Sequence, residues 1–531
     1  MDNINNRHKI FLQKISHRVM LEKGMYPDFL QKAITELEKI KEPLLPFNRP
    51  GCHDLRNLLW CSIDNDDSLD LDQLTAAEQC ADGTVKIFVA IADVDSLVKK
   101  QSAIDNHAKH NTTSVYTAGA TYAMIPEKLS NNLTSLNLNA DRAAVVIEMC
   151  FNPSGTLVNS KIYEAVVKNH AKLTYNGVSA WLENGQIPQG IRDVPGLDEN
   201  IRLQEKVAQQ LKLRRQENGA LDLETIETKP VFEGDILKEL TIAKSNRASF
   251  IIEDFMIAAN GVTARFLTSK NFPSVRRVVR VPKRWDRIVL LAAEKEFKLP
   301  AIPDSKALEQ FLESQEKASP LTFPDLSLSI IKLLGPGEYV IEMPGEKPIG
   351  HFGLAVKDYA HSTAPNRRYP DVITQRLIKA AIAGKPCPYT KGELEILAKH
   401  CTEMEDAAKK VERQVEKSAA ALLLEGRLGN EFDAIVTGVN EKGTWVRLID
   451  PPVEGKLLSS PAGLDVGNQL KVWLEHTDVK RGFIDFRTGD KNSSKKPYQK
   501  PKFNKDAWRQ NSRKFHRKNR NKNNALKMFR V

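Results

Sequence analysis

Residues 62–73 read Ser62-Ile63-Asp64-Asn65-Asp66-Asp67-Ser68-Leu69-Asp70-Leu71-Asp72-Gln73. This stretch holds five carboxylates within nine residues. Because like charges repel and raise one another's pKa, such a cluster is costly to pack unless a cation lies among the acids. Hard oxygen ligands suit Mg²⁺ or Mn²⁺, and these ions can hold a phosphoryl group and activate water. The stretch is therefore a candidate site for metal-dependent phosphoryl chemistry.

Two other structures would explain the same acids: an EF-hand calcium loop and a solvated surface loop. The EF-hand fails because its sixth position is Leu69 instead of glycine and its twelfth is Thr75 instead of glutamate. A solvated loop is the usual fate of an acidic run, and the acids alone leave it open. The apolar run at 89–93 favours a site, because functional loops are often carried by buried strands.

Composition limits the class of protein. The 531 residues suggest two to four domains, and 41% hydrophobic residues are enough for real cores. Six cysteines lie far apart with no C-x-x-C pair, so neither a zinc site nor a disulfide framework is indicated. No signal peptide and no apolar run of about 18 residues is visible. We expect a cytoplasmic protein with reduced thiols and no membrane association.

The positive charge is concentrated at the C-terminus. Residues 491–531 contain 15 Lys or Arg and one acid, Asp506, which leaves a net −3 for the rest of a chain of net charge +11. We expect a disordered basic tail held near a polyanion. Phe503, Trp508, Phe515 and Phe529 are interleaved with its charges and could stack on bases. A solubilising tail without a specific target is the alternative.

The pattern of the elements predicts an α+β protein. The runs 85–91 and 143–149 indicate buried strands that precede most of the helices. Helical periodicity predicts helices over 198–216, 249–268, 283–296, 369–383 and 392–424. Five short strands are predicted at 433–439, 444–448, 455–458, 469–476 and 482–486, which is the size of a small OB barrel.

These elements divide the chain into four parts. We expect a helical hairpin over 1–49, a large catalytic domain over 50–428, an OB barrel over 429–490 and the disordered tail over 491–531. The hairpin has apolar faces and no catalytic pattern, so it is a candidate surface for a protein partner. The oligomeric state stays open.

Six further segments follow the acidic stretch in a fixed order. They are Val89-Ala90-Ile91-Ala92-Asp93-Val94, Thr113-Ser114-Val115-Tyr116, Met124-Ile125-Pro126-Glu127-Lys128-Leu129-Ser130, Ile252-Glu253-Asp254-Phe255-Met256-Ile257-Ala258-Ala259-Asn260, His351-Phe352-Gly353-Leu354-Ala355 and Tyr359-Ala360-His361-Ser362-Thr363-Ala364-Pro365-Asn366-Arg367-Arg368-Tyr369-Pro370-Asp371. Together with the acids they resemble the RNB catalytic signature of the ribonuclease II and ribonuclease R family. The barrel resembles an S1 RNA-binding domain, with Trp445 where such domains present an aromatic face. Family members usually carry cold-shock barrels first, so the resemblance implies a short form without them.

The resemblance implies roles for the acidic residues. Asp64, Asp70 and Asp72 match three of the family's four catalytic aspartates, and Gln73 stands at the fourth. Asp64, Asp72 and Gln73 would be metal ligands, while Asp70 and Asp72 would order the phosphate and the metal-bound water. An amide oxygen can still ligate Mg²⁺ but carries no negative charge. Arg367 matches the arginine that contacts the reacting phosphate.

The alternative for Arg367 is an ordinary salt bridge with Asp371, four residues further on. Two neighbours depart from the family pattern, since Ala364 replaces a serine and Asn366 an isoleucine. The resemblance also implies RNA-binding roles for Tyr116, Tyr175, Arg368 and Trp445, and a position near the site for Glu253 and Glu412. A buried aromatic residue with an ordinary packing role is the alternative for both tyrosines and for Trp445.

We therefore expect a 3′→5′ exoribonuclease that hydrolyses single-stranded RNA to nucleoside 5′-monophosphates with Mg²⁺, for which Mn²⁺ could substitute. The alternative is a catalytically weak RNB protein that binds RNA as an adaptor or regulator. Gln73 is the best support for that alternative, and the joint presence of the three aspartates and Arg367 argues against it.

Overall fold

The structure is a computed structural model that describes residues 7–47, 49, 51–243, 245–458 and 463–489. By its internal contacts the chain divides into residues 1–488 and residues 489–531. All helices and strands given below belong to the first part. The predicted basic tail lies outside the described residues.

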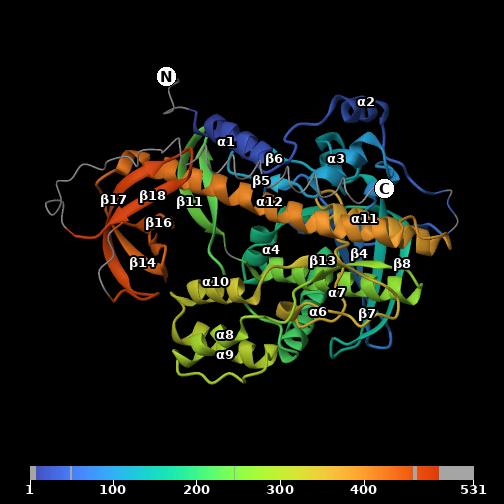
Figure 1. Cartoon of the computed structure of the whole chain (residues 1–531). Helices are drawn as coiled ribbons and strands as arrows, with labels where there is room; N and C mark the ends of the chain where they lie inside the picture. Colours follow the sequence, from blue (N-terminus) through green and yellow to red (C-terminus); the bar gives the residue numbers. More distant parts are fainter. Residues whose placement is uncertain (1–6, 48, 50, 244, 459–462, 490–531) are drawn as a thin grey trace, which may run out of the picture. The chain divides into compact units, whose positions relative to one another are not determined.

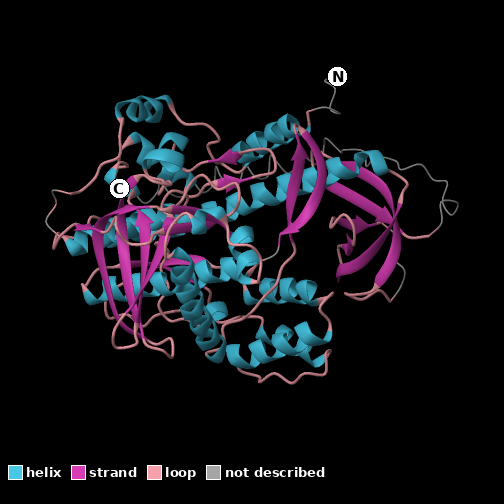
Figure 2. Ribbon diagram, turned by 180° about the vertical axis from the view of Figure 1, so that it is seen from behind, coloured by secondary structure: helices cyan, strands magenta, loops and turns pink. Residues whose placement is uncertain are grey.

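A seven-stranded mixed sheet organises the large domain (Figures 1 and 2). Its strand order is β1-β8-β7-β4-β3-β2-β9, with β1 and β9 parallel to their neighbours and the other pairs antiparallel. The strands are β1 (His53–Asp54), β2 (Cys61–Asp64), β3 (Gln73–Gln79), β4 (Val85–Ala92), β7 (Asp141–Phe151), β8 (Leu157–Lys168) and β9 (Ala171–Thr174). The two strands predicted from apolar runs are confirmed as the central neighbours β4 and β7.

Strand β4 is apolar on both faces because both faces of the sheet are covered. Ile87, Val89 and Ile91 belong to the largest core, whereas Phe88 and Ala90 belong to a smaller core on the other face. Helices pack against the sheet on the side of the larger core (Figure 2). They include α4 (Tyr175–Leu182), α5 (Gln189–Arg192), α6 (Leu197–Glu217), α7 (Arg247–Ser269) and α11 (Tyr369–Ile382). The predicted helices over 198–216, 249–268 and 369–383 are confirmed.

The 34-residue helix α12 (Lys391–Leu424) connects the large domain to the barrel. It contacts β13 (Glu338–Glu342), the hairpin strand β11 (Ile236–Ala243), and strands β17 and β18 of the barrel. A capping box at Thr390 and Glu393 starts the helix. This helix is the predicted one over 392–424.

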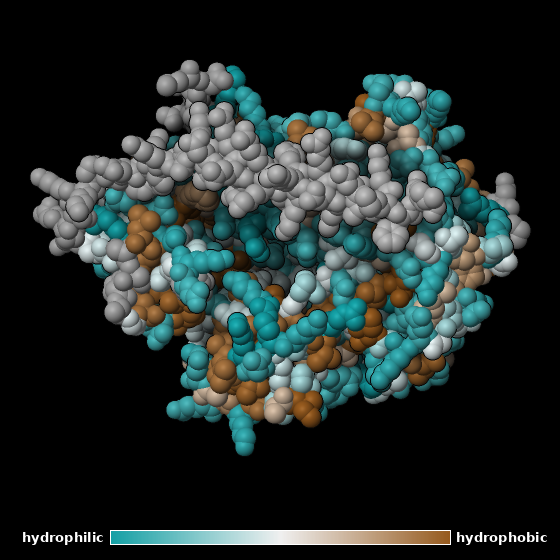
Figure 3. All heavy atoms as spheres, in the orientation of Figure 1, coloured by the Kyte–Doolittle hydropathy of each residue, from teal (hydrophilic) through white to brown (hydrophobic). Residues whose placement is uncertain are grey.

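Three helices form a unit with its own core around Trp285 and Phe311. They are α8 (Trp285–Ala293), α9 (Ser305–Ala318) and α10 (Phe323–Leu334). The helix predicted over 283–296 is α8, shorter than expected at both ends. Figure 3 shows apolar side chains among polar ones over these helices. Leu290 on α8 and Leu321 in the turn between α9 and α10 are more than half exposed.

The C-terminal strands close into a five-stranded barrel in the order β14-β15-β16-β18-β17. They are β14 (Glu431–Asn440), β15 (Gly443–Leu448), β16 (Glu454–Leu457), β17 (Gln469–Asp478) and β18 (Phe483–Arg487). All five strands were predicted, and their buried side chains include Val446, Val472 and Phe486. Arg447 on β15 pairs with Asp325 on α10 at 2.9 Å, which fastens the barrel to the three-helix unit.

Two helices precede the sheet, as predicted: α1 (His8–Glu22) and α2 (Gln31–Lys39). Helix α1 buries Leu12, Ile15 and Val19 and packs against α12. The remaining elements are α3 (Ala103–Asn111), β5 (Val115–Tyr116), β6 (Thr121–Tyr122), β10 (Glu227–Glu233), β12 (Ser274–Val278), and the short turns Val94–Ser96, Leu129–Leu133, Phe352–Leu354 and Glu425–Arg427. Among the described residues, no helix combines the length and apolarity needed to cross a membrane.

Candidate active site

The predicted acidic stretch joins β2 to β3 at one end of the central sheet. Asp64 ends β2, and Gln73 begins β3. The loop between them is held by Ser135, whose Oγ accepts from the Leu71 N–H and donates to the Leu69 carbonyl, each at 2.9 Å. The backbone carbonyl of Asp72 accepts from the Ala92 N–H at 2.9 Å. These bonds fix the acids at the end of a rigid sheet.

Asp72 is the buried centre of the site, with 1% of its surface exposed. One carboxylate oxygen accepts from the Asn366 backbone N–H at 2.9 Å, and the other accepts from the Nε–H of Arg367 at 3.1 Å. The alternative in which Arg367 pairs with Asp371 is wrong: Arg368 makes that pair. Asp371 lies in the first turn of α11 and pairs with the N-cap residue Arg368, while Arg367 is paired with Asp72.

Burial dominates the electrostatics of Asp72. It raises the pKa of this carboxyl to about 7, aided by the charge of Asp70 and opposed by Arg367 and the Asn366 N–H. A carboxylate with so little water around it depends on its fixed partners. For Arg367, burial is the largest single effect and lowers the pKa, but Asp72, Tyr116 and Asp64 together outweigh it, so the pKa is raised.

Asp70 is tied to Tyr116 and, through it, to α12. The Tyr116 hydroxyl donates to an Asp70 carboxylate oxygen at 2.9 Å, and the Tyr116 N–H donates to Glu412 at 3.0 Å. Burial raises the pKa of Glu412. Tyr116 remains 44% exposed, so its ring is accessible beside the acids. This contact places Glu412 beside Tyr116, whose hydroxyl is bonded to Asp70.

Asp64 lies on the Tyr175 side of the site. Burial, followed by the charges of Asp64 and Glu253, raises the pKa of Tyr175, while Arg367 lowers it. Tyr175 begins α4 directly after Thr174, whose hydroxyl caps the helix by accepting from the Gly177 N–H at 3.1 Å. The structure therefore brings both predicted tyrosines and both predicted glutamates to the same site as the acids and Arg367.

Three polar residues that the sequence did not single out surround the acidic loop. Lys229 on β10 donates to the Asn65 side chain at 3.2 Å. Lys172 on β9 donates to the Ser68 carbonyl and Asn176 on α4 to Asp66, each at 2.7 Å. Nothing in the local sequence marks these residues, because their contacts join segments about 100 to 160 residues apart.

The donor set suits a magnesium ion held partly by its substrate. Asp64 and Asp70 are partly exposed oxygen donors, whereas Gln73 is 5% exposed and pairs in register with Ile91. Among the described residues, no three His, Cys, Asp or Glu side chains are grouped closely enough to hold a metal alone. Mg²⁺ usually binds one or two carboxylates plus waters and substrate phosphates, so these residues fit that ion.

Two of the predicted RNA-binding residues stand apart from the acids. Arg368 is engaged by both oxygens of Asp371 at 2.8 and 2.9 Å. Trp445 lies on β15 in the barrel, partly exposed, with the Lys456 ammonium 6.0 Å from its ring centre. Their RNA contacts stay predictions.

Two models of known protein families match the sequence of this chain. The sequence model of the RNB domain matches residues 52–384, and the model described as the RNase II-type exonuclease C-terminal S1 domain matches residues 430–488. The chain belongs to the RNB-domain family. Its five-stranded barrel is the S1 domain, as predicted.

Relatives and solved structures agree with this assignment. Ribonuclease R of Aquifex aeolicus is 32% identical over 446 residues, which is 82% of this chain. The chain spans about three fifths of that relative's length, 62%. The fold is similar to "Mycoplasma genitalium RNase R in complex with ribose methylated single-stranded RNA", with a TM-score of 0.81 and 23% identity over 90% of this chain and 78% of that one.

The same fold also occurs in "yeast Ssd1, a pseudonuclease", with a TM-score of 0.67 and 15% identity over 83% of this chain and 55% of that one. The fold of an RNB domain is thus shared by proteins with different activities. The activity of this chain therefore has to be inferred from the side chains at the site and not from the fold alone.

Proposed function

We propose that this RNB-domain protein is a 3′→5′ exoribonuclease that hydrolyses single-stranded RNA to nucleoside 5′-monophosphates with Mg²⁺. The observation that carries the proposal is the buried Asp72 carboxylate, which orients Arg367 beside two further aspartates. A buried carboxylate at the end of a sheet is expensive to maintain, and together with the 44% exposed Arg367 side chain it supplies what phosphodiester cleavage needs. The ribonuclease R relative supports the same reaction class.

Arg367 would stabilise the charge that develops on the reacting phosphate. Its contact with Asp72 uses the Nε–H, and among the described residues the two terminal amino groups make no hydrogen bond. They can therefore donate a bidentate pair to phosphate oxygens. Because the guanidinium is already oriented, little reorganisation is needed during the reaction.

Asp64 and Asp72, with the Gln73 amide, would hold the metal ion, and Asp70 and Asp72 would order the phosphate and the metal-bound water. Bound Mg²⁺ would neutralise phosphate charge and lower the pKa of a coordinated water. Tyr116 holds Asp70 by its hydroxyl and leaves its ring exposed. Tyr175 and Tyr116 would then contact nucleotides at the 3′ end, since every base offers a face for stacking.

The remaining expectations extend this proposal. Trp445 on the S1 barrel would bind RNA upstream of the site, and Mn²⁺ would substitute for Mg²⁺ at the same oxygen ligands. A cytoplasmic location and a protein partner at α1 and α2 stay predictions from the sequence.

A second function, an RNA-binding adaptor with weak catalysis, has one specific observation in its favour. Gln73 puts a neutral amide where the family has a carboxylate, and this residue is almost fully buried. A neutral ligand would weaken metal binding. The retained Asp72–Arg367 pair argues for the enzyme, because an adaptor has no use for an oriented guanidinium beside three acids.

The test is an incubation of 5′-labelled single-stranded RNA with purified protein and Mg²⁺. We expect stepwise shortening from the 3′ end, which stops in Asp72→Asn and on an RNA with a blocked 3′ end. Tight RNA binding without shortening in Mg²⁺ or Mn²⁺ would favour the adaptor. Internal cuts on the blocked RNA would contradict the exonucleolytic direction.

A further inference from the structure

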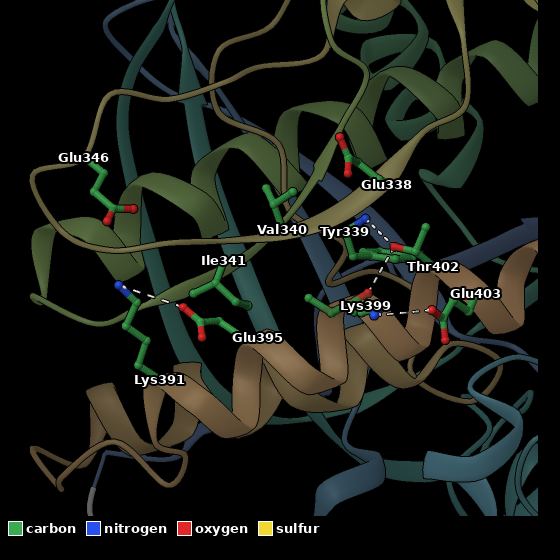
Figure 4. A pocket seen from close by; sticks show the side chains of 11 residues that line it. Glu338, Tyr339, Val340, Ile341, Glu346, Lys391, Glu395, Lys399, Thr402 and Glu403 are labelled. Atoms are coloured by element: carbon green, nitrogen blue, oxygen red, sulfur yellow. Dashed lines mark hydrogen bonds and ion pairs between the residues drawn. The ribbon is translucent and has the colours of Figure 1, made fainter. Parts of the chain in front are cut away.

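The cavity between β13 and the first half of α12, about 510 Å³ in volume, is lined by groups that already have partners (Figure 4). The Tyr339 N–H donates to the Thr402 hydroxyl at 2.9 Å, and Lys391 pairs with Glu395 across one turn of α12. Its walls therefore leave little for a ligand to bind. A buried amide that lacks a partner lies instead in the active site, on the residue whose N–H binds Asp72.

That residue is Asn366, in the segment 362–368 that we call the arginine loop. Its backbone N–H donates to one oxygen of Asp72 at 2.9 Å, and the Nε–H of the next residue, Arg367, donates to the other oxygen at 3.1 Å. The Asn366 side chain is fully buried, and its Oδ1 lies 2.6 Å from the Thr134 hydroxyl. A movement of Asn366 therefore moves both groups that bind Asp72.

The Thr134 hydroxyl acts as a hydrogen-bond donor to Asn366. It lies within reach of two acceptors, the Asn366 Oδ1 and the Leu129 carbonyl at 2.8 Å, but a hydroxyl has only one proton to donate. The Leu129 carbonyl already accepts from the Thr134 backbone N–H at 3.0 Å. The Asn366 Oδ1 has no other donor among the described residues, so this hydroxyl alone fixes the amide.

The segment that carries Thr134 is itself held firmly and also reaches the acidic loop. Ser135, the next residue, binds the backbone of the acidic loop at two points. The buried Arg142 on β7 donates to the Ser135 carbonyl and to the Asn132 carbonyl, each at 3.0 Å. Two adjacent side chains on one fixed segment thus hold the two halves of the site: Ser135 holds the acidic loop and Thr134 holds the arginine loop.

The nitrogen of the Asn366 amide gains nothing from its surroundings. Nδ2 is buried and has no hydrogen-bond partner within the described residues. A buried donor without a partner lowers stability, so an apolar side chain of similar size would suit this position at least as well. The family pattern has isoleucine there. The contribution that sets the amide apart is therefore its one bond, to Thr134.

We propose that Asn366 is a positioning residue, whose bond to Thr134 sets the arginine loop where the Asn366 N–H and the Arg367 Nε–H both reach Asp72. The inference rests on the proposed function for its kinetic consequence only. A guanidinium held in place lowers the barrier of the reaction more than it strengthens the binding of RNA. Loss of the bond should therefore lower kcat and leave KM nearly unchanged.

The experiment compares variants of the full chain in the assay with 5′-labelled RNA and Mg²⁺. Asn366→Leu removes the amide but keeps the backbone N–H, so kcat should fall about tenfold with KM within about twofold, while the urea midpoint of unfolding stays unchanged or rises. Thr134→Val should lower kcat by a similar factor, and Thr134→Ser, which keeps the hydroxyl, should retain it. The double variant Asn366→Leu, Thr134→Val should lose no more than about tenfold, because both side chains act through one bond.

Asn200→Leu is the matched control. Asn200 is also a buried amide, but it binds both backbone groups of Ala77 on β3 and makes no bond to the arginine loop. Its loss should lower the urea midpoint and leave kcat unchanged, which is the opposite pattern to Asn366→Leu. Equal losses of kcat in these two variants would make Asn366 an ordinary structural residue and overturn the proposal. A Thr134→Ser variant as slow as Thr134→Val would also overturn it.

A second readout does not depend on activity. The exchange of the Arg367 Nε–H with solvent is measured by NMR on protein with isotope-labelled arginine, and Arg367→Lys assigns the signal. We expect exchange at least about tenfold faster in Asn366→Leu than in wild type, and no change in Asn200→Leu. Unchanged exchange in Asn366→Leu would overturn the proposal. If the wild-type protein does not shorten RNA, the proposed function fails, and the exchange measurement alone decides whether Asn366 positions Arg367.

Discussion

Replacing Asp72 by asparagine should stabilise the protein at neutral and alkaline pH while abolishing activity. The carboxyl is buried and its pKa is raised to about 7 from an ordinary value of 3.8. The folded state therefore binds a proton that the unfolded state releases between these two values. Stability falls as pH rises through this window. Asparagine resembles the protonated acid and does not titrate, so the variant keeps its free energy of unfolding as the pH rises.

The size of the effect follows from the difference in pKa. About three pKa units at 1.36 kcal/mol per unit give about 4 kcal/mol at full ionisation. The carboxyl is 1% exposed, so no allowance for solvent screening is needed. The difference in free energy of unfolding between the variant and the wild type should grow by about 3 kcal/mol from about pH 5 to about pH 8. The rest of the difference arises below pH 5, where the carboxyl of the unfolded chain begins to ionise.

The assay is urea unfolding of wild type and Asp72→Asn at a series of pH values, with EDTA present to remove metal ions. The free energies of unfolding should agree near pH 4 and diverge progressively above pH 5, with the variant the more stable. Equal or lower stability of the variant at about pH 8 would refute the reasoning. It would mean that Asn366 and Arg367 fully compensate the buried charge.

Three further substitutions test the site. Arg367→Lys keeps the positive charge but loses the two parallel N–H donors that bind a phosphate bidentately, so kcat should fall about a hundredfold with little change in KM. A change in KM alone would show that Arg367 acts only in substrate binding. Gln73→Asp restores a carboxylate and should lower the Mg²⁺ concentration for half-maximal activity about tenfold, and an unchanged Mg²⁺ titration would separate this position from the metal. Lys229→Ala should raise the KM for RNA and lower the salt slope of binding by about one, whereas Lys238→Ala on the far strand of the hairpin should do neither; equal slopes would show that Lys229 does not contact phosphate.

The parts of the site that the sequence predicted are those encoded within single segments. The acidic stretch, the arginine pair and the tyrosines each lie in a short motif, so their residue types and spacing already indicate chemistry. The five barrel strands were predicted for a similar reason, since each is a short run between turns marked by glycine or proline. The strand runs at 85–91 and 143–149 are apolar apart from Lys86 and Glu148 because both sheet faces are covered.

The parts that could not be predicted depend on which segments meet in three dimensions. Arg367 and Arg368 are adjacent, and both i,i+3 and i,i+4 contacts occur on helices, so only the three-dimensional structure shows which one pairs with Asp371. Lys229 reaches Asn65 across 164 residues of sequence.

The most direct test of the central claim is mass spectrometry of the small products formed from single-stranded RNA, Mg²⁺ and this protein in heavy-oxygen water. Hydrolysis at the Asp72–Arg367 site predicts nucleoside 5′-monophosphates, each carrying one heavy oxygen on its phosphate. The same reaction with Asp72→Asn, which should be folded and more stable than wild type, should yield none. Absence of labelled monophosphates from the wild-type protein, under conditions where it binds the RNA, would contradict the account.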